Sequence, residues 1–190
     1  MTRPEKMVKL KQHLCDKFKL SSDEAQRLTE FKENSKPLNE RIRKCELTSE
    51  DNIVCRQLES ALQKLPPAQE TIVYRNINLV DFQLSKAKEY FKVDKDIRFR
   101  EFLSCTTREC FTGDSSHFNC IIKILTSKES QAKNIFKLWD KFELNDAEKE
   151  VIYPWNSCFK ILEVKITKNC ITMTVEEIKI DMNTTVVPEF

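Results

Sequence analysis

Glycine is almost absent from this chain of 190 residues, in which Gly113 is the single example. Glycine-rich phosphate-binding loops need several glycines, because their backbone takes up positive φ angles and approaches the phosphates closely. A Rossmann fingerprint and a P-loop are therefore both excluded. Kinases, GTPases and Rossmann-type dehydrogenases are excluded with them, and any bound nucleotide must be held by side chains and strand backbone.

A strong net charge and a long apolar run are also lacking. The chain has 32 basic and 30 acidic residues, and this balance gives no argument for a nucleic-acid partner or an anionic membrane. No apolar run approaches the ~20 residues that cross a bilayer. Residues 1–18 mix charges throughout and do not resemble a signal peptide. We therefore expect a soluble protein, cytoplasmic or secreted, of undetermined oligomeric state.

Metal-binding patterns of cysteine and histidine are missing as well. The eight cysteines contain no CxxC pair, and the two histidines, His13 and His117, lie far apart in the sequence. The sequence therefore predicts no metal site. The even number of cysteines would allow disulfides in an oxidising compartment, but several cysteines fall within apolar patterns where a reduced, buried thiol is common. We interpret most of them as core residues.

The first 65 or so residues have the apolar periodicity of helices. Ser21 and Glu24 have the spacing of a capping box, and Thr48 or Ser49 can cap a later helix. The two prolines at 66–67 would end that helix. Several short segments rich in β-branched and aromatic residues follow: 71–75, 102–106, 118–124, 150–153, 158–166 and 170–180. Helices followed by strands indicate an α+β protein rather than a parallel βαβ array.

We predict one domain over residues 1–190, with a helical part at about 1–65 and a β-rich part at about 70–182. Within the β-rich part, Glu148 and Glu150 lie two residues apart where a strand is expected to begin. If the strand includes both, their side chains emerge on the same face. Two such carboxylates can stabilise a sugar cation and accept a proton. The alternative, two solvated charges on an exposed face, is the usual case for an arbitrary Glu-x-Glu.

Three motifs in a fixed order change this assessment. They are Val-Tyr-Arg at 73–75, Phe-Leu-Ser-Cys-Thr at 102–106 and Glu-Lys-Glu-Val-Ile-Tyr-Pro at 148–154. Together they resemble the Arg–Ser–Glu signature of the arginine-specific mono-ADP-ribosyltransferases, the cholera-toxin-like branch shared by vertebrate ecto-enzymes and bacterial toxins. The segments 38–43 (Leu-Asn-x-x-Ile-Arg) and 58–66 are similar to that family too. The resemblance covers roughly residues 22–180.

The resemblance implies N-terminal helices followed by a mostly antiparallel, two-sheet β core of the ADP-ribosyltransferase type. It also implies a glycosyltransferase that uses NAD⁺ as co-substrate, without a metal, and moves ADP-ribose to an accessible arginine of a partner protein. Glu150 would stabilise the oxocarbenium character of the ribose, and Glu148 would orient the acceptor guanidinium and take its proton. Arg75 would hold the phosphates or the neighbouring ribose, and Ser104 would position Glu150 or the ribose.

Three further residues have weaker roles in this interpretation. Thr106 and Phe118 are candidates to contact NAD⁺, although packing in the core of a strand is the better interpretation for Phe118. Phe142, just before the Glu pair, is a candidate to stack on the acceptor guanidinium, or else a loop aromatic packed into the core.

The chain departs from the family pattern in two places within the motifs: Cys105 stands where the family has a hydroxyl residue, and Asn76 where it has glycine. Two alternatives stay open. One is an NAD⁺ glycohydrolase with water as acceptor, and the other is a non-catalytic domain that keeps the fold for binding.

Overall fold

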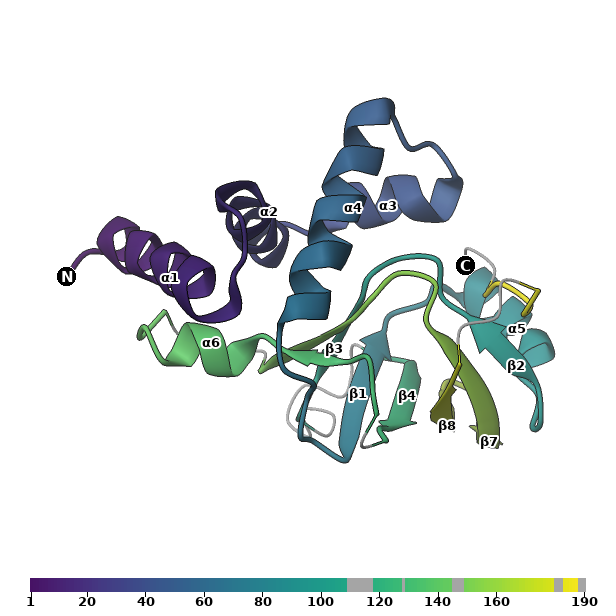
Figure 1. Ribbon diagram of the computed structural model, residues 1–190. Coiled ribbons are helices and arrows are strands. Elements are labelled where there is room, and N and C mark those ends of the chain that lie inside the picture. The colour runs from purple at the N-terminus through teal and green to yellow at the C-terminus, as the bar shows by residue number, and fades with distance from the viewer. Residues whose placement is uncertain (109–117, 128, 145–148, 180–182, 188–190) are drawn as a thin grey trace.

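The computed structural model describes residues 1–108, 118–127, 129–144, 149–179 and 183–187. Its helices are α1 (Arg3–Phe18), α2 (Ser22–Glu33), α3 (Lys36–Lys44), α4 (Ser49–Lys64), α5 (Asp81–Tyr90) and α6 (Phe136–Asp140). Its strands are β1 (Ile72–Ile77), β2 (Asp96–Arg98), β3 (Leu103–Thr106), β4 (Cys120–Leu125), β5 (Lys133–Asn134), β6 (Glu150–Tyr153), β7 (Cys158–Ile166) and β8 (Ile171–Ile178). Figure 1 shows α1–α4 gathered on one side of the sheet, with α5 near the C-terminus.

The predicted capping side chains are found at the N-termini of α2 and α4. Ser21 and Glu24 form a reciprocal capping box at the start of α2. Thr48, rather than Ser49, is the N-cap of α4, and its hydroxyl accepts a hydrogen bond from the backbone N–H of Asp51. These side chains satisfy backbone N–H groups that have no partner within the helix, which sharpens each helix start.

The predicted α+β class is confirmed, because helices come first and the strands that follow are mostly antiparallel. Among the described residues, the strands form one hydrogen-bonded sheet of eight in the order β2-β7-β8-β4-β1-β3-β6-β5, where the prediction had two sheets. The two predicted sheets form one continuous sheet because β1 pairs with β4 on one side and with β3 on the other. Six residue pairs connect β1 with β4, which is a full ladder, whereas Tyr74 opposite Thr106 is the one pair between β1 and β3.

Two hydrophobic clusters fill the interior formed by the described residues. One lies within the β-rich part and includes Val73, Leu103 and Cys105. The other packs α1–α4 against the strands and includes Phe102 and Ile152. The Phe102 ring lies edge-on to Phe31 of α2, with ring centroids 5.3 Å apart, and its carbonyl accepts a hydrogen bond from Asn39 Nδ2 of α3 at 3.0 Å. The start of β3 is thereby anchored to the helices.

Two further observations complete the fold. None of the helices in the described part of the chain combines the length and the apolar character that a membrane span requires. The cysteines at positions 15, 45, 55, 105, 120, 158 and 170 are free thiols, and those at 55, 105, 120 and 158 are buried, as we predicted for most of them.

An ion pair joins α3 to α4. Arg41 donates from Nε and Nη2 to the two carboxylate oxygens of Asp51, at 2.9 and 2.7 Å. The hydrogen bonds from Arg41, followed by that from the Thr48 backbone, hold the pKa of Asp51 well below its usual range. A carboxyl whose pKa is lower in the folded state stabilises the fold above its unfolded pKa of about 4, and this stabilisation is lost as the pH falls through the folded pKa.

Asp51→Asn removes the negative charge that accepts hydrogen bonds from Arg41 and from the backbone N–H of Thr48. We therefore expect it to lower the melting temperature at pH 7 by roughly 2–4 °C. The difference from wild type should shrink below pH 4, as the wild-type carboxyl becomes protonated. Thermal unfolding followed by circular dichroism between pH 2 and 7 measures this. Glu50→Gln, an exposed change in the same helical turn, is the control. A difference that stays constant down to pH 2 would contradict the assignment.

Candidate active site

The carboxylate of Glu150 is buried at the start of β6, and the residue is 4% exposed. In the register of β3 and β6, Glu150 lies opposite Thr106 and Ser104 lies opposite Ile152. Alternation along the strands therefore places Ser104, Thr106 and Glu150 on one face. The Ser104 hydroxyl donates a hydrogen bond to Glu150 Oε1 at 2.5 Å. A charge-assisted bond of this length fixes the carboxylate in place.

The second oxygen of the same carboxylate is engaged by a residue that sequence reasoning missed. Lys32 Nζ, from the last turn of α2, lies 3.1 Å from Glu150 Oε2, and the two side chains are 13% and 5% exposed. The sequence held no signal for this pair, because the two residues are brought together only when α2 packs against the sheet. The predicted acidic residue is thus held by one hydroxyl and one ammonium group.

Arg75 of β1 joins this cluster through the main chain of β3. Its Nη1 donates to the carbonyl oxygen of Ser104 at 2.9 Å. Its Nε is buried and has no hydrogen-bond partner among the residues that the structure describes. The structure brings Arg75, Ser104 and Glu150 together, as the ordered motifs indicated.

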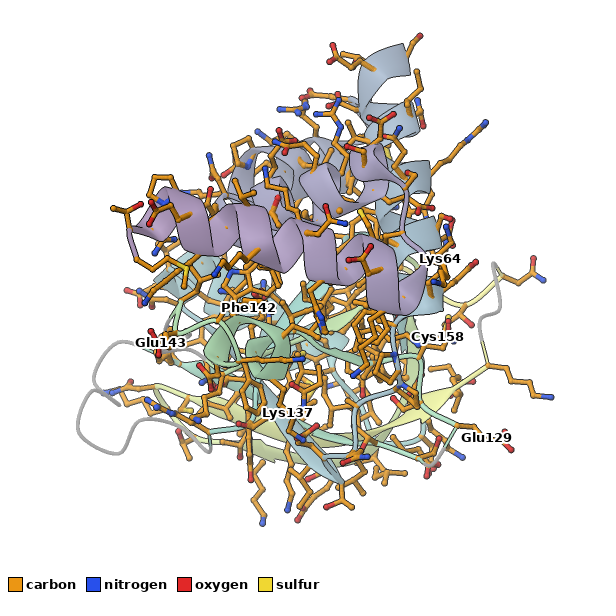
Figure 2. All side chains as sticks on the ribbon, turned by 60° about the vertical axis from the view of Figure 1, so that its left-hand side comes forward. Lys64, Glu129, Lys137, Phe142, Glu143 and Cys158 are labelled. Carbon is orange, nitrogen blue, oxygen red and sulfur yellow. The ribbon has the colours of Figure 1, made fainter. Side chains whose placement is uncertain are left out.

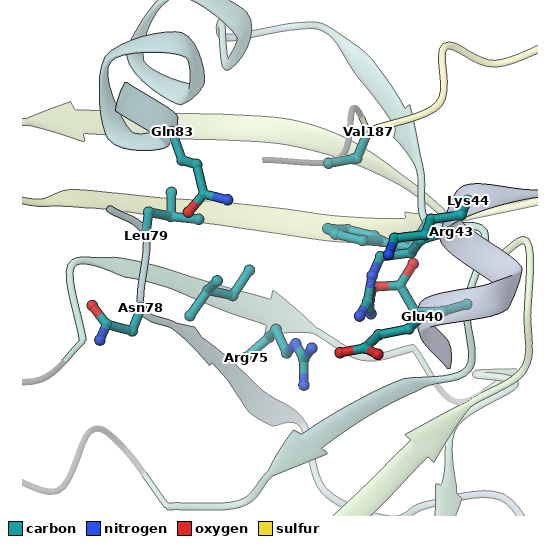
Figure 3. Close-up of a pocket in the computed structure, with 11 residues that line it drawn as sticks. Glu40, Arg43, Lys44, Arg75, Asn78, Leu79, Gln83 and Val187 are labelled. Carbon is teal, nitrogen blue, oxygen red and sulfur yellow. Dashed lines mark ion pairs between the residues drawn. The ribbon is translucent and has the colours of Figure 1, made fainter. Parts of the chain in front are cut away.

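A cavity of about 350 Å³ lies on one side of Arg75. Arg43 and Glu40 of α3 line it together with Gln83 of α5 and with Leu79, which precedes that helix. Figure 3 shows that the side chains of Arg75, Arg43 and Glu40 converge on one side of this cavity. Glu101 lines the cavity too and forms an ion pair with Arg43 at 3.5 Å, so an anionic ligand such as a diphosphate would share Arg43 with this carboxylate and meet Arg75 as a second guanidinium. The volume is within the range of small-molecule sites. Arg43 lies in the segment 38–43 that resembled the family, but no role had been predicted for it.

A smaller cavity of about 160 Å³ is also lined in part by Arg75. It is lined by Arg75, Ser104, Thr106 and Phe118, which are the residues predicted to contact NAD⁺, and also by Tyr74, Asn76 and Cys105. Arg75 therefore lines both cavities. The roles of Thr106 and Phe118 toward NAD⁺ stay predictions.

The acceptor side is placed in part. Glu148 lies outside the described residues, and β6 begins at Glu150, so strand alternation gives no argument for where its side chain points. Phe142 packs against His13 of α1, with ring centroids 5.3 Å apart. Lys6 of α1 forms an ion pair with Glu143 at 2.9 Å. Figure 2 shows Phe142 and Glu143 beneath α1. The segment after α6 is thus held by α1, and acceptor binding by Phe142 stays a prediction.

Cys105 separates the two hydroxyl residues of β3 and faces the opposite way. It belongs to the sheet cluster, and burial raises the pKa of its thiol to about 12. The family's hydroxyl residue is replaced here at a position that faces the core, so the face with Ser104 and Thr106 keeps its hydroxyls. Within the described part of the chain, no group of three or more His, Cys, Asp or Glu side chains could hold a metal ion.

Comparison with known families gives a match over nearly the whole chain. A family model described as ADP-ribosyltransferase exoenzyme matches residues 5–186. No curated protein matches the sequence significantly.

Solved structures share the fold at low sequence identity. The C3 exoenzyme of Clostridium limosum is 17% identical, with a TM-score of 0.65 and coverage of 94% of this chain and 96% of that one. C3stau2 from S. aureus, solved with NAD, is 19% identical, with a TM-score of 0.65 and coverage of 94% and 97%. Vis, from Vibrio splendidus, was solved in complex with agmatine and is 18% identical, with a TM-score of 0.64 and coverage of 99% and 92%.

The environment of Cys105 leads to a labelling prediction. The thiolate is the form that reacts with iodoacetamide, so a buried thiol with a raised pKa should stay unmodified in the folded protein. Cys45 is exposed and should be alkylated under the same conditions. Mass spectrometry of the peptides after brief treatment at pH 8 measures both, and treatment in urea, where both should react, is the control. Equal labelling of the two in the native protein would show that β3 does not bury Cys105.

Proposed function

The chain belongs to the ADP-ribosyltransferase exoenzyme family, and from this premise we propose that it transfers ADP-ribose from NAD⁺ to arginine side chains of proteins. The observation that carries the proposal is the buried carboxylate of Glu150, held by Ser104 at 2.5 Å. Ser104 also accepts a hydrogen bond through its backbone carbonyl from Arg75, which lines two cavities. This arrangement is the one expected of a carboxylate that acts on one end of a long anionic substrate such as NAD⁺.

The donor side of the proposal follows the two cavities. The diphosphate of NAD⁺ binds between Arg43 and Arg75 in the larger cavity, since each planar guanidinium can donate two parallel hydrogen bonds to phosphate oxygens. The nicotinamide end lies in the smaller cavity, near Ser104, Thr106 and Phe118. The structure of C3stau2 with NAD supports a site for this co-substrate in the same fold. Side chains and strand backbone hold the nucleotide, as the lack of glycine requires.

The chemical step is cleavage of the bond between the ribose and nicotinamide. The electron pair of that bond leaves with nicotinamide, and the ribose acquires oxocarbenium character. A fixed carboxylate near the ribose stabilises this charge, and a preorganised group of this kind commonly contributes about 3 kcal/mol. In the proposal, Glu150 supplies the carboxylate, and the hydrogen bond from Ser104 fixes it before the substrate arrives.

The acceptor side rests on Glu148. A guanidinium has a pKa above ~12, so it must be oriented and must lose a proton as it attacks the ribose. A carboxylate two residues before Glu150 can bind it with both oxygens and accept that proton. Agmatine carries such a guanidinium group, and its presence in the Vis structure supports its use as a test acceptor here. The protein partner is then one that exposes an arginine.

The donor step predicts a large effect for Glu150→Gln. The amide keeps the shape but removes the negative charge, so kcat for nicotinamide release from NAD⁺ should fall by roughly 10²–10³-fold. Chromatography of nicotinamide and transfer of labelled ADP-ribose to proteins of a cell lysate measure it. Glu163→Gln, on a β7 side chain that is 54% exposed, is the matched control and should keep full activity. A Glu150→Gln rate within tenfold of wild type would refute the assigned role.

The acceptor step predicts a different result for Glu148→Gln. Formation of ADP-ribosyl-agmatine should fall by roughly 10²-fold, because general-base catalysis is lost, while nicotinamide release without agmatine should change only a few-fold. Mass spectrometry separates ADP-ribosyl-agmatine from free ADP-ribose. Equal losses in both reactions would contradict an acceptor role for Glu148. Release of free ADP-ribose by the wild type at a rate that agmatine does not alter would instead identify an NAD⁺ glycohydrolase.

A further inference from the structure

A lysine of the helical part binds the carboxylate on which the proposed reaction depends. We propose that Lys32 is a positioning residue, which acts on the reaction by fixing the orientation of Glu150. The inference rests on the proposed function, and it concerns a residue outside the three motifs that define the site.

The contact between these residues is buried and closes the carboxylate on its second side. Ser104 holds Oε1 at 2.5 Å, and the ammonium of Lys32 lies 3.1 Å from Oε2. The last torsion of a glutamate is soft, so one hydrogen bond leaves the plane of the carboxylate free to turn. The ion pair with Lys32 on the other oxygen restricts that rotation. Ion pairs on the surface contribute little, because water competes for both charges. The side chains of Lys32 and Glu150 are only 13% and 5% exposed, so water competes little for this pair.

The backbone around Lys32 is itself held in place. Its neighbour Phe31 packs edge-on against Phe102, and Asn39 of α3 donates a hydrogen bond to the Phe102 carbonyl at 3.0 Å. Phe102 stands two residues before Ser104. Phe102 therefore helps to position both residues that contact Glu150. It precedes Ser104 in the chain, and it packs against Phe31, the neighbour of Lys32 in α2. This common support keeps their separation constant, which a preorganised site needs.

The test compares Lys32→Met, Lys32→Arg and wild type by steady-state kinetics of nicotinamide release. Methionine keeps the length of the side chain and removes its charge. A loosened carboxylate should lower kcat by roughly 10–100-fold while the KM for NAD⁺ changes less than about threefold, because Lys32 does not line either cavity. Lys32→Arg should restore most of the activity, since it returns a cation to Oε2. If Lys32→Met does not fold, Lys32→Gln takes its place and should show a loss in the same direction.

The matched control is Lys64→Met. Lys64 of α4 forms an ion pair with Glu24 at 2.7 Å, and the Glu24 side chain is 9% exposed. The change removes the same charge from a buried carboxylate in the same helical part, so it should lower thermal stability without altering kcat. A kcat that falls equally in Lys32→Met and Lys64→Met would show a general loss of structure and would overturn the inference.

Coupling to Glu150 completes the test. In a Glu150→Gln background, Lys32→Met should change the residual rate less than about twofold, because a positioning residue acts through the group that it positions. Equal losses in both backgrounds would overturn the inference, as would a Lys32→Met enzyme that is as fast as wild type or faster. A folded wild type that releases no nicotinamide would overturn the proposed function together with this inference, whereas an active but unaffected Lys32→Met overturns the inference alone.

Discussion

The antiparallel pairing of β3 with β6 determines where the reactive groups of this chain lie. With Thr106 opposite Glu150, the carboxylate and the Ser104 hydroxyl share one face and come within hydrogen-bond distance. A slip of one residue would turn Ser104 to the other face and separate them. The next two residues of β6 oppose such a slip from both sides of the sheet, because Val151 is buried in the sheet cluster and Ile152 in the helical cluster. Burial of apolar side chains thus fixes the distance between two polar ones.

The helical part contributes to the site as well as to the core. Arg43 of α3 lines the larger cavity, and Lys32 of α2 reaches the buried carboxylate. Both helices contact Phe102, through the ring of Phe31 and the side chain of Asn39. The helical part and the β-rich part are therefore packed together at the start of β3. A loss of packing there would disturb the cavity and the carboxylate together.

The sequence predicted what depends on local pattern and on ordered motifs. Strands 150–153 and 158–166 were predicted at their observed bounds, since each has a run of β-forming residues with clear ends. The strands β2 and β5 have three and two residues, too few for a period to show, and both were missed. Arg75 and Ser104 were predicted as site residues because they lie within motifs. Lys32 and Glu40 were missed, because their proximity to the site arises only from the packing of helices on the sheet.

The scarcity of glycine has a consequence for how the site is built. In the described part of the chain, positive φ angles occur at six non-glycine residues. Three of these lie near the candidate site or the segment before it: Cys45 ends α3, Glu143 follows α6, and Lys149 precedes Glu150 with φ of 49°. A left-handed conformation costs a residue with a side chain roughly 1–2 kcal/mol, which the surrounding contacts must offset. Glu143 is held by Lys6, and Lys149 directly precedes the buried start of β6. A glycine at position 149 would relieve this cost but would also widen the backbone conformations open to the residue before Glu150. The side chain at this position therefore restricts the backbone conformation of the residue that precedes the buried carboxylate.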